Sequence, residues 1–335
     1  MVLVKTSLCH VPGWQQQLAS SISDPAELLQ ELEIDPGLIP SSKAAAAQFS
    51  MRVPRSFVSR MRKGDPNDPL LRQVLPLEAE LIRVPGFTED PVGDRFAQCA
   101  PGILHKYYGR VLLSVTRACA IHCRYCFRRK TNNTKVHTGM KEWQQTLNYI
   151  TSDTSLYEVI LSGGDPLSLS DKRLSALLME LDCIPHLGRL RIHSRQPIVL
   201  PERVNNGLLK VLAQSRLQLV LVVHTNHPRE IDNDVRTALS RLEQIGVRLF
   251  NQSVLLRGIN DTAETLAELS ESLFSAHVLP YYLHILDRVC GAAHYEVKEE
   301  EASGILRSLR QWLPGYLVPK LVREEPGQMS KTLLV

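Results

Sequence analysis

Residues from about 110 onward predict an α/β fold in which six parallel strands, each followed by a helix, form a closed or partial barrel. Short apolar runs alternate there with amphipathic stretches of ten or more residues, a pattern typical of a parallel sheet covered on both faces. Polar clusters stand at the carboxyl ends of the strands, where a β/α barrel carries its active site. This placement favours a barrel over a doubly wound open sheet.

The elements follow from the same alternation. The predicted strands are Val111–Val115, Glu158–Leu161, Arg189–Ile192, Leu217–Val223, Val247–Leu256 and Pro280–Leu286. The predicted helices cover about 141–151, 171–182, 203–214, 231–245, 261–276 and 297–312. Three regions result: a mainly helical accessory region at 1–100, the barrel at 101–312, and a short segment at 313–335.

The accessory region shows helical spacing and turns instead of strand alternation. A helix begins near Asp24, where proline occupies the first turn and leucines follow at helical spacing. A second helix is predicted from Ala44 to Phe57, broken at Pro54. The segments 61–70 and 85–91 are rich in glycine, proline and aspartate, and they predict connecting loops.

Three cysteines follow the first strand within eight residues: Cys119, Cys123 and Cys126. This spacing suits a loop around one metal centre, and thiolate is the ligand that iron–sulfur clusters take. A cubane held by three cysteines keeps one iron open to a small molecule. Structural zinc is the alternative, although a closed zinc site needs a fourth ligand such as His122 or one of the scattered cysteines. Burial of three small side chains without a metal is the third reading.

Composition describes an ordinary globular chain of 335 residues, with 44% hydrophobic and 22% charged residues. No apolar run reaches the roughly 18 residues that a transmembrane helix requires. The first residues lack a signal-type apolar core, and an odd count of seven cysteines argues against a disulfide framework, so we expect a cytoplasmic protein. The net charge of +4 is spread along the chain, with one basic knot at Arg128-Arg129-Lys130. Nucleic-acid binding would need a broader basic stripe.

Five further strand ends carry polar residues. They are Ser162-Gly163-Gly164-Asp165, His193-Ser194-Arg195, His224-Thr225-Asn226-His227, Asn251-Gln252-Ser253 and Asp287. Each cluster alone is also typical of a turn or a helix cap. The glycines after the second strand would let the amino-acid group of a ligand approach the backbone closely.

The CxxxCxxC spacing resembles that of the radical S-adenosylmethionine enzymes. Within them, residues 100 to the end resemble the lysine 2,3-aminomutase family, on the motifs Tyr107-Tyr-Gly-Arg110, Leu161-Ser-Gly-Gly-Asp-Pro-Leu, His193-Ser-Arg-Gln-Pro and His224-Thr-Asn-His-Pro. The resemblance implies a partial (β/α)6 TIM-like barrel with a helical N-terminal extension and a C-terminal cofactor-binding tail. It implies a [4Fe-4S] cluster, S-adenosylmethionine and pyridoxal 5'-phosphate as cofactors.

Site residues follow from the same resemblance. It puts the cluster on the three cysteines and S-adenosylmethionine against Gly163, Gly164, Asp165, Ser194 and Gln252. The catalytic Lys331 would hold pyridoxal phosphate as a Schiff base, for which a lysine amine is the natural partner. Arg110 would bind the cofactor phosphate and Arg128 the substrate carboxylate, roles that suit a planar cation. The family commonly has a run of glycines before the lysine, whereas this chain has Gly327-Gln-Met-Ser330.

Substrate choice rests on two acids, Asp287 and Glu324, which fall where family members that act on lysine surround the distal ammonium. Aspartate is usual at the second position, and the longer glutamate arm is a departure. The resemblance implies an isomerase that moves the 2-amino group of L-lysine to carbon 3 by radical chemistry. The alternatives are a 2,3-aminomutase for another amino acid and, in a different class, a non-catalytic cluster or zinc protein that binds RNA.

The short chain after Lys331 resembles the branch of the family that supplies β-lysine for modification of translation elongation factor P. This branch implies a functional link to elongation factor P and its lysyl ligase, and an electron donor such as flavodoxin or ferredoxin. We expect no membrane partner and no direct nucleic-acid binding.

Overall fold

The computed structural model describes residues 13–130 and 140–334. The expectation that the chain lacks a leader depends on the first ten residues, which lie outside these ranges. Its strands are β1 (Gln98–Ala100), β2 (Ile103–Tyr107), β3 (Arg110–Thr116), β4 (Glu158–Gly163), β5 (Arg189–Ser194), β6 (Gln218–His224), β7 (Arg248–Val254), β8 (Leu279–His284), β9 (Lys320–Arg323) and β10 (Thr332–Leu333). Its longer helices are α3 (Ile39–Gln48), α5 (Met140–Ser152), α6 (Asp171–Asp182), α8 (Asn206–Ala213), α9 (Asn233–Gln244), α10 (Ala263–Phe274) and α11 (Glu299–Trp312). The shorter ones are α1 (Trp14–Ala19), α2 (Pro25–Glu31), α4 (Arg55–Val58) and α7 (Gln196–Val199).

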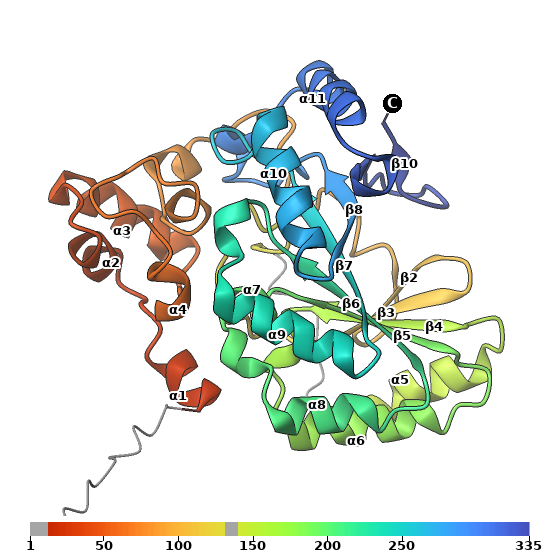
Figure 1. Ribbon diagram of the computed structural model, residues 1–335. Coiled ribbons are helices and arrows are strands. Elements are labelled where there is room, and N and C mark those ends of the chain that lie inside the picture. Colours follow the sequence, from red (N-terminus) through yellow and green to blue (C-terminus); the bar gives the residue numbers. More distant parts are fainter. Residues whose placement is uncertain (1–12, 131–139, 335) are drawn as a thin grey trace, which may run out of the picture.

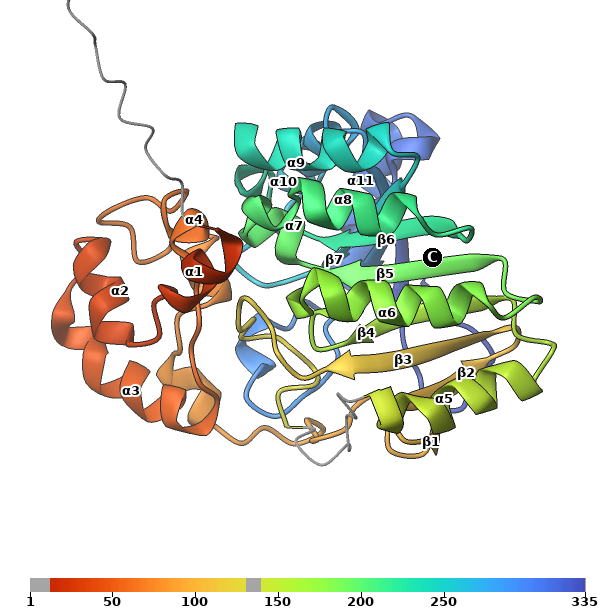
Figure 2. The same ribbon diagram turned by 90° about the horizontal axis from the view of Figure 1, so that it is seen from below.

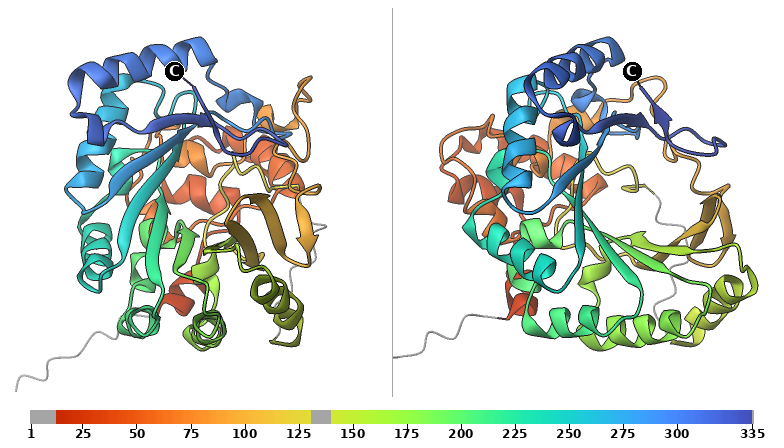
Figure 3. Two further views of the ribbon diagram at one scale, coloured as in Figure 1. Left: turned by 90° about the vertical axis from the view of Figure 1, so that its right-hand side faces the viewer. Right: turned by 45° about the vertical axis from the view of Figure 1, so that its right-hand side comes forward.

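The described strands form one ten-stranded sheet in the order β1 to β10. Neighbouring strands are parallel from β3 to β9, whereas β1, β2 and β10 pair antiparallel at the two ends. A doubly wound sheet would reverse its strand order at a switch point, and this sheet does not. The sheet curves with helices on its outer face (Figure 1; Figure 3). Since β1 and β10 are both edges among the described strands, the barrel is open, and the predicted partial barrel is confirmed.

All six predicted strands and the six helices that follow them are present. Helix α6 spans the predicted 171–182, because Ser170 caps its first turn and Leu174, Leu177, Leu178 and Leu181 bury one face. The edge strands β1, β2 and β10 were not predicted. Each is two to five residues long, and β9 was anticipated only as part of the tail. Strands this short give little periodicity to detect.

The predicted helix from Ala44 to Phe57 is present only in part: residues 44–48 lie in α3 and residues 55–57 in α4, whereas the prediction is wrong for the residues between them. Helix α3 ends at Gln48, and Phe49 is extended. The backbones of Val53 and Ile22 exchange two hydrogen bonds of 2.9 Å, so residues before Pro54 pair in an extended conformation. Pro54 then stands at the N-cap of the four-residue helix α4. The alanine-rich stretch keeps its helical preference inside α3, and long-range pairing sets the extended conformation of Val53, beyond the helix end.

The accessory helices α1 to α4 lie at the carboxyl ends of the parallel strands (Figure 2). Leu28 of α2 and Phe57 of α4 belong to the same buried cluster as barrel residues such as Leu161 and Leu221. Arg60 donates to the Ile198 carbonyl oxygen at 2.7 Å, which ties the accessory region to α7. The divisions after residues 100 and 312 stay predictions. No helix in the described ranges has the length and apolar character needed to cross a membrane.

Candidate active site

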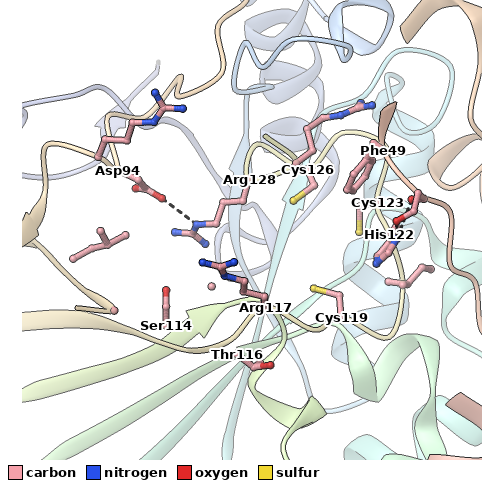
Figure 4. Close-up of a pocket in the computed structure, with 18 of the residues that line it drawn as sticks. Phe49, Asp94, Ser114, Thr116, Arg117, Cys119, His122, Cys123, Cys126 and Arg128 are labelled. Carbon is pink, nitrogen blue, oxygen red and sulfur yellow. Dashed lines mark hydrogen bonds and ion pairs between the residues drawn. The ribbon is translucent and has the colours of Figure 1, made fainter. Parts of the chain in front are cut away.

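The cysteine loop begins where β3 ends and lines a cavity of about 660 Å³. The Ala118 amide donates to Thr116 Oγ1 at 3.1 Å, which turns the chain out of the strand. Cys119, Cys123 and Cys126 all line the cavity, and their sulfur atoms face a common space in Figure 4. The volume lies within the range of small-molecule and cofactor sites.

The donor set of the loop fits an iron–sulfur cluster. No group of three His, Cys, Asp or Glu side chains within 13–130 and 140–334 is placed to hold a single metal ion. In a cubane cluster each cysteine binds a different iron atom. The three sulfur atoms must therefore surround a space as large as the cluster, and they need not converge on one metal ion. Burial, together with the neighbouring Cys123, raises the pKa of Cys126 to about 11. A bound cation would favour the thiolate form that ligation requires.

Buried arginines hold the cysteine loop against the accessory region. Arg124 donates to both carboxylate oxygens of Glu80, at 2.8 and 2.6 Å, and Arg129 donates to the same carboxylate at 2.5 Å. The side chains of these three residues are at most 2% exposed. Arg124 and Arg129 therefore have structural roles, and Arg129 of the basic knot is buried instead of solvated. The role of Glu80 could not be recognised from the sequence, because its two arginine partners lie more than 40 residues away along the chain.

Arg195 reaches the cysteine loop from the end of β5. Its guanidinium donates to Cys123 Sγ at 2.8 Å, to Tyr125 Oη at 2.7 Å and to Glu230 at 3.0 Å. The side chain is 5% exposed, and Glu230 compensates its charge. Hydrogen bonds to ligating sulfur atoms are one of the ways in which a protein tunes a cluster. The sequence placed Arg195 in a polar strand end but predicted no contact with a cysteine.

Gly163 and Gly164 let the cysteine loop approach the end of β4. A Cβ atom on Gly164 would lie 2.7 Å from the Ala118 carbonyl oxygen, and one on Gly163 would lie 2.6 Å from Ser114 Oγ. The Gly164 amide donates to the Thr116 carbonyl oxygen at 2.9 Å. These glycines were predicted for contact with a ligand. Their first role in the structure is close packing of two backbones, and both also line the cavity.

We expect Gly164→Ala to reduce the iron bound after anaerobic reconstitution by several-fold, because backbone atoms of residues 116–118 must move to admit the Cβ atom. Iron and sulfide assays would measure the loss. Gly304→Ala is the matched control, since a Cβ atom on Gly304 in α11 meets only one side-chain atom, at 4.0 Å. Full iron content in Gly164→Ala would show that the loop tolerates displacement.

Asp165 and Ser194 hold the loops after β4 and β5 together. The Asp165 carboxylate accepts hydrogen bonds from Ser194 Oγ at 2.7 Å and from the Arg195, Gln196 and Leu167 amides at 2.8 to 3.1 Å. Both side chains are buried. Gln252 lies on β7 and pairs with Tyr282 of β8. The predicted contacts of these residues with S-adenosylmethionine stay predictions.

A chain of five charged groups connects the cavity to the C-terminal tail. Arg128 Nε lies 3.0 Å from Asp94 Oδ2 (Figure 4), and Lys106 Nζ lies 2.6 Å from Asp94 Oδ1. Lys106 Nζ also lies 2.8 Å from Glu324 Oε1, and Lys331 Nζ lies 2.5 Å from Glu324 Oε2. The structure thus links Arg128, Glu324 and Lys331 through Asp94 and Lys106, two residues that sequence reasoning missed, while the predicted ligand contacts of Arg128, Glu324 and Lys331 stay predictions.

The two predicted acids differ in their electrostatic surroundings. Burial, together with the charge on Glu324, raises the pKa of Asp287 to about 7. Burial also disfavours ionised Glu324, but the ammonium groups of Lys331 and Lys106 outweigh this effect and lower its pKa to about 2. Glu324 is therefore a carboxylate already held by two lysines, whereas Asp287 gains or loses its proton near neutral pH.

Arg110 lies at the end of β3 that is farther from the cysteines. Arg110 begins β3, and the cysteine loop follows its other end, roughly 20 Å away at about 3.3 Å per residue. The Arg110 guanidinium lies over the Tyr107 ring, with its Cζ 4.9 Å from the ring centroid. Lys331 Nζ lies 5.9 Å from the centroid of the Tyr282 ring. A phosphate at Arg110 and a cluster at the cysteines would occupy opposite ends of the barrel.

Three histidines leave hydrogen-bonding atoms without partners inside the barrel. Among the described residues, Nε2 of His193, His224 and His284 is buried and makes no hydrogen bond. Burial lowers the pKa of all three, and that of His224 falls to about 3. They are therefore neutral at pH 7. Such orphaned polar atoms near Lys331 fit a site that receives a polar ring or a polar substrate.

This chain is similar to several known proteins. Residues 108–182 match a family model described as a 4Fe-4S single cluster domain. The L-lysine 2,3-aminomutase of Escherichia coli (strain K12) is 50% identical over 322 residues, which cover 96% of this chain and 94% of that protein. The L-lysine 2,3-aminomutase of Haemophilus influenzae is 45% identical over 321 residues, covering 96% of this chain and 95% of that protein. A solved radical SAM methyltransferase from Sphaerobacter thermophilus matches 66% of this chain and 68% of its own with 18% identity and a TM-score of 0.48.

Proposed function

Because this chain belongs to the lysine 2,3-aminomutase family, we propose that it is an isomerase that moves the 2-amino group of L-lysine to carbon 3. One structural observation supports the choice of substrate. The proposed carboxylate-binding Arg128, the acid Glu324 and the proposed cofactor lysine Lys331 belong to one continuous chain of ion pairs. A substrate with a carboxylate at one end and an ammonium at the other matches these two poles.

The residues that would hold the cofactors lie in three places. Cys119, Cys123 and Cys126 would hold the [4Fe-4S] cluster, and Gly163 and Gly164, with Asp165, Ser194 and Gln252 nearby, would border S-adenosylmethionine. Lys331 would bind pyridoxal phosphate covalently, and Arg110 would bind its phosphate. When bound, the cluster and S-adenosylmethionine supply a radical that removes a substrate hydrogen, and pyridoxal phosphate carries the migrating amino group.

The protein orients the substrate and keeps water away. Arg128 presents a planar guanidinium, whose Nη1 also lies 3.4 Å from Ser162 Oγ, toward the cavity. Asp287 and Glu324 supply negative charge for the distal ammonium, and a carboxylate about 4 Å from an ammonium gains about 4 kcal/mol at an effective dielectric of about 20, before desolvation. The neutral histidines accept or donate hydrogen bonds without adding charge. The accessory helices cover the carboxyl ends of the strands above the site.

We expect the affinity for lysine to rise with pH through about 7, because Asp287 must lose its proton to attract an ammonium. The same shift has the opposite effect on folding. Between about pH 4 and pH 7 the folded chain keeps this proton while the unfolded chain releases it, so the free energy of unfolding falls as pH rises.

Asp287→Asn tests both consequences. At pH 8 we expect kcat/KM for lysine to fall by roughly thirty-fold to a thousand-fold, the equivalent of about 2 to 4 kcal/mol. At the same pH the melting temperature should increase, because a buried charge has been removed. Steady-state kinetics and thermal melts between pH 5 and pH 9 would measure the two effects. A variant that converts lysine as well as the unchanged protein would contradict the substrate assignment, even with the radical chemistry intact.

We further propose that the β-lysine serves the modification of elongation factor P, the role that the resemblance to that branch of the family implies. The experiment is an anaerobic assay with reconstituted protein, reductant and S-adenosylmethionine. Free lysine and lysylated elongation factor P are offered separately, and β-lysine is sought by mass spectrometry. If neither substrate yields β-lysine, the result would favour the alternative that the protein is a 2,3-aminomutase for another amino acid. A colourless protein without iron or pyridoxal absorbance would favour the non-catalytic RNA-binding alternative.

A further inference from the structure

Lys106 is the central residue of the charge chain. Its ammonium donates to the Glu324 carboxylate at 2.8 Å and to the Val92 carbonyl oxygen at 2.9 Å, and it lies 2.6 Å from Asp94 Oδ1. The side chain is 18% exposed. Burial disfavours its charged form, but Glu324 and Asp94 outweigh this effect and raise the pKa of Lys106. The ammonium thus makes two hydrogen bonds, to Glu324 and Val92, and an ion pair with Asp94.

These contacts span the open side of the barrel. Lys106 lies on β2, the second strand from one edge of the sheet, whereas Glu324 directly follows β9 near the other edge. The two ends of the sheet are thus joined by an ion pair where strand pairing is missing. The segment that carries Asp94 also crosses this gap, because Thr88 bridges to Val289.

The two oxygens of Glu324 are divided between two lysines. Lys106 holds Oε1, and Lys331 holds Oε2. If Lys331 binds a cofactor, its contact with Glu324 Oε2 is lost and that oxygen becomes available to another cation. The contact between Lys106 and Glu324 Oε1 does not involve Lys331, so it is kept. Asp94 meanwhile holds both Lys106 and Arg128. The position of Glu324 relative to Arg128 is therefore set through Asp94 and Lys106.

We propose that Lys106 is a positioning residue that sets the span between Arg128 and Glu324 and thereby selects the length of the substrate. This inference rests on the proposed function, because it assumes that the two residues bind the carboxylate and the distal ammonium of one molecule. The ligand class is a linear diamino acid with the chain length of lysine. A diamino acid one methylene shorter cannot make both contacts across a span that is held constant. With Lys106 removed, Glu324 can move and discrimination by length is lost.

The test measures binding without turnover. Holoprotein carrying its cluster and pyridoxal phosphate, without S-adenosylmethionine or reductant, is titrated with L-lysine and with L-ornithine, and binding is followed by the visible absorbance of the bound cofactor. We expect Lys106→Met to weaken lysine binding by about tenfold or more while ornithine changes by less than about threefold. Lys106→Arg, which keeps a cation that can contact both carboxylates, should restore most of the preference. KM for lysine should increase more than kcat falls.

Lys63→Met is the matched control, since Lys63 forms an exposed ion pair of 2.6 Å with Glu33 in the accessory region. It should leave both affinities unchanged. The inference is overturned if Lys106→Met keeps the lysine preference, or if lysine and ornithine weaken equally. Should Lys106→Met lose iron or fail to fold, two other variants decide. The inference is overturned if Asp94→Asn keeps the preference for lysine over ornithine. It is also overturned if Lys106→Arg shows no such preference. If the unchanged holoprotein binds no lysine, the proposed function itself fails.

Discussion

Alanine at Cys119, Cys123 or Cys126 is expected to remove most of the bound iron and sulfide and to lower activity by about a thousand-fold or more. The three sulfur atoms face one space at the end of β3, so the loss of any one leaves an iron without its protein ligand. Iron and sulfide assays on anaerobically purified protein, together with the visible spectrum, would measure the loss. In the proposed radical mechanism the cluster supplies the electron, so no partial pathway would remain.

Cys183→Ala is the control for this series, because Cys183 is an exposed free cysteine that caps α6. It should keep its full iron content. A triple variant that retains iron, or unchanged protein that contains zinc after anaerobic purification, would refute the cluster assignment. In that case the thiol loop would need the fourth ligand that a closed zinc site requires.

Lys331→Ala is expected to lose covalently bound pyridoxal phosphate and to lower activity by about a thousand-fold or more. Borohydride reduction of the unchanged protein should fix the pyridoxyl group on the peptide that contains Ser330-Lys331-Thr332. Peptide mapping by mass spectrometry locates the label. Removing Lys331 also takes one of two ammonium partners from Glu324, so the pKa of that carboxyl should increase from its low value of about 2.

Lys320→Ala is the control, since Lys320 is an exposed lysine on β9 of the same tail. Its cofactor content should not change. A pyridoxyl label on Lys320 or Lys298 would move the assignment to another lysine while leaving the cofactor in place. The adjacency of Lys331 and Glu324, at 2.5 Å, makes Lys331 the better placed of the three for a reaction inside the barrel.

The partial barrel was predictable because it depends on local and repetitive signals. Short apolar runs recur along the chain, as at Glu158–Gly163, whose first five residues are buried, and the helices between them carry one apolar face. The edge strands β1, β2 and β10 lack this repetition. Their pairing partners define them, and a partner cannot be read from two to five residues.

The site divides in the same way. Spacing along one loop made Cys119, Cys123 and Cys126 visible in the sequence, and resemblance pointed to Lys331 and Glu324. Glu80, Asp94 and Lys106 were invisible, because a single acid or lysine without a motif around it usually faces solvent.

The sequence alone determined the barrel repeat and the cysteine loop, since both depend on neighbours within one element or one loop. Only the tertiary structure decided which charges meet. Lys106 and Glu324 are separated by 218 positions in the chain, yet they join the two ends of an open sheet at 2.8 Å. Ion pairing is a property of distance in space, and in a barrel that distance is set by the order and curvature of all the strands between the two partners.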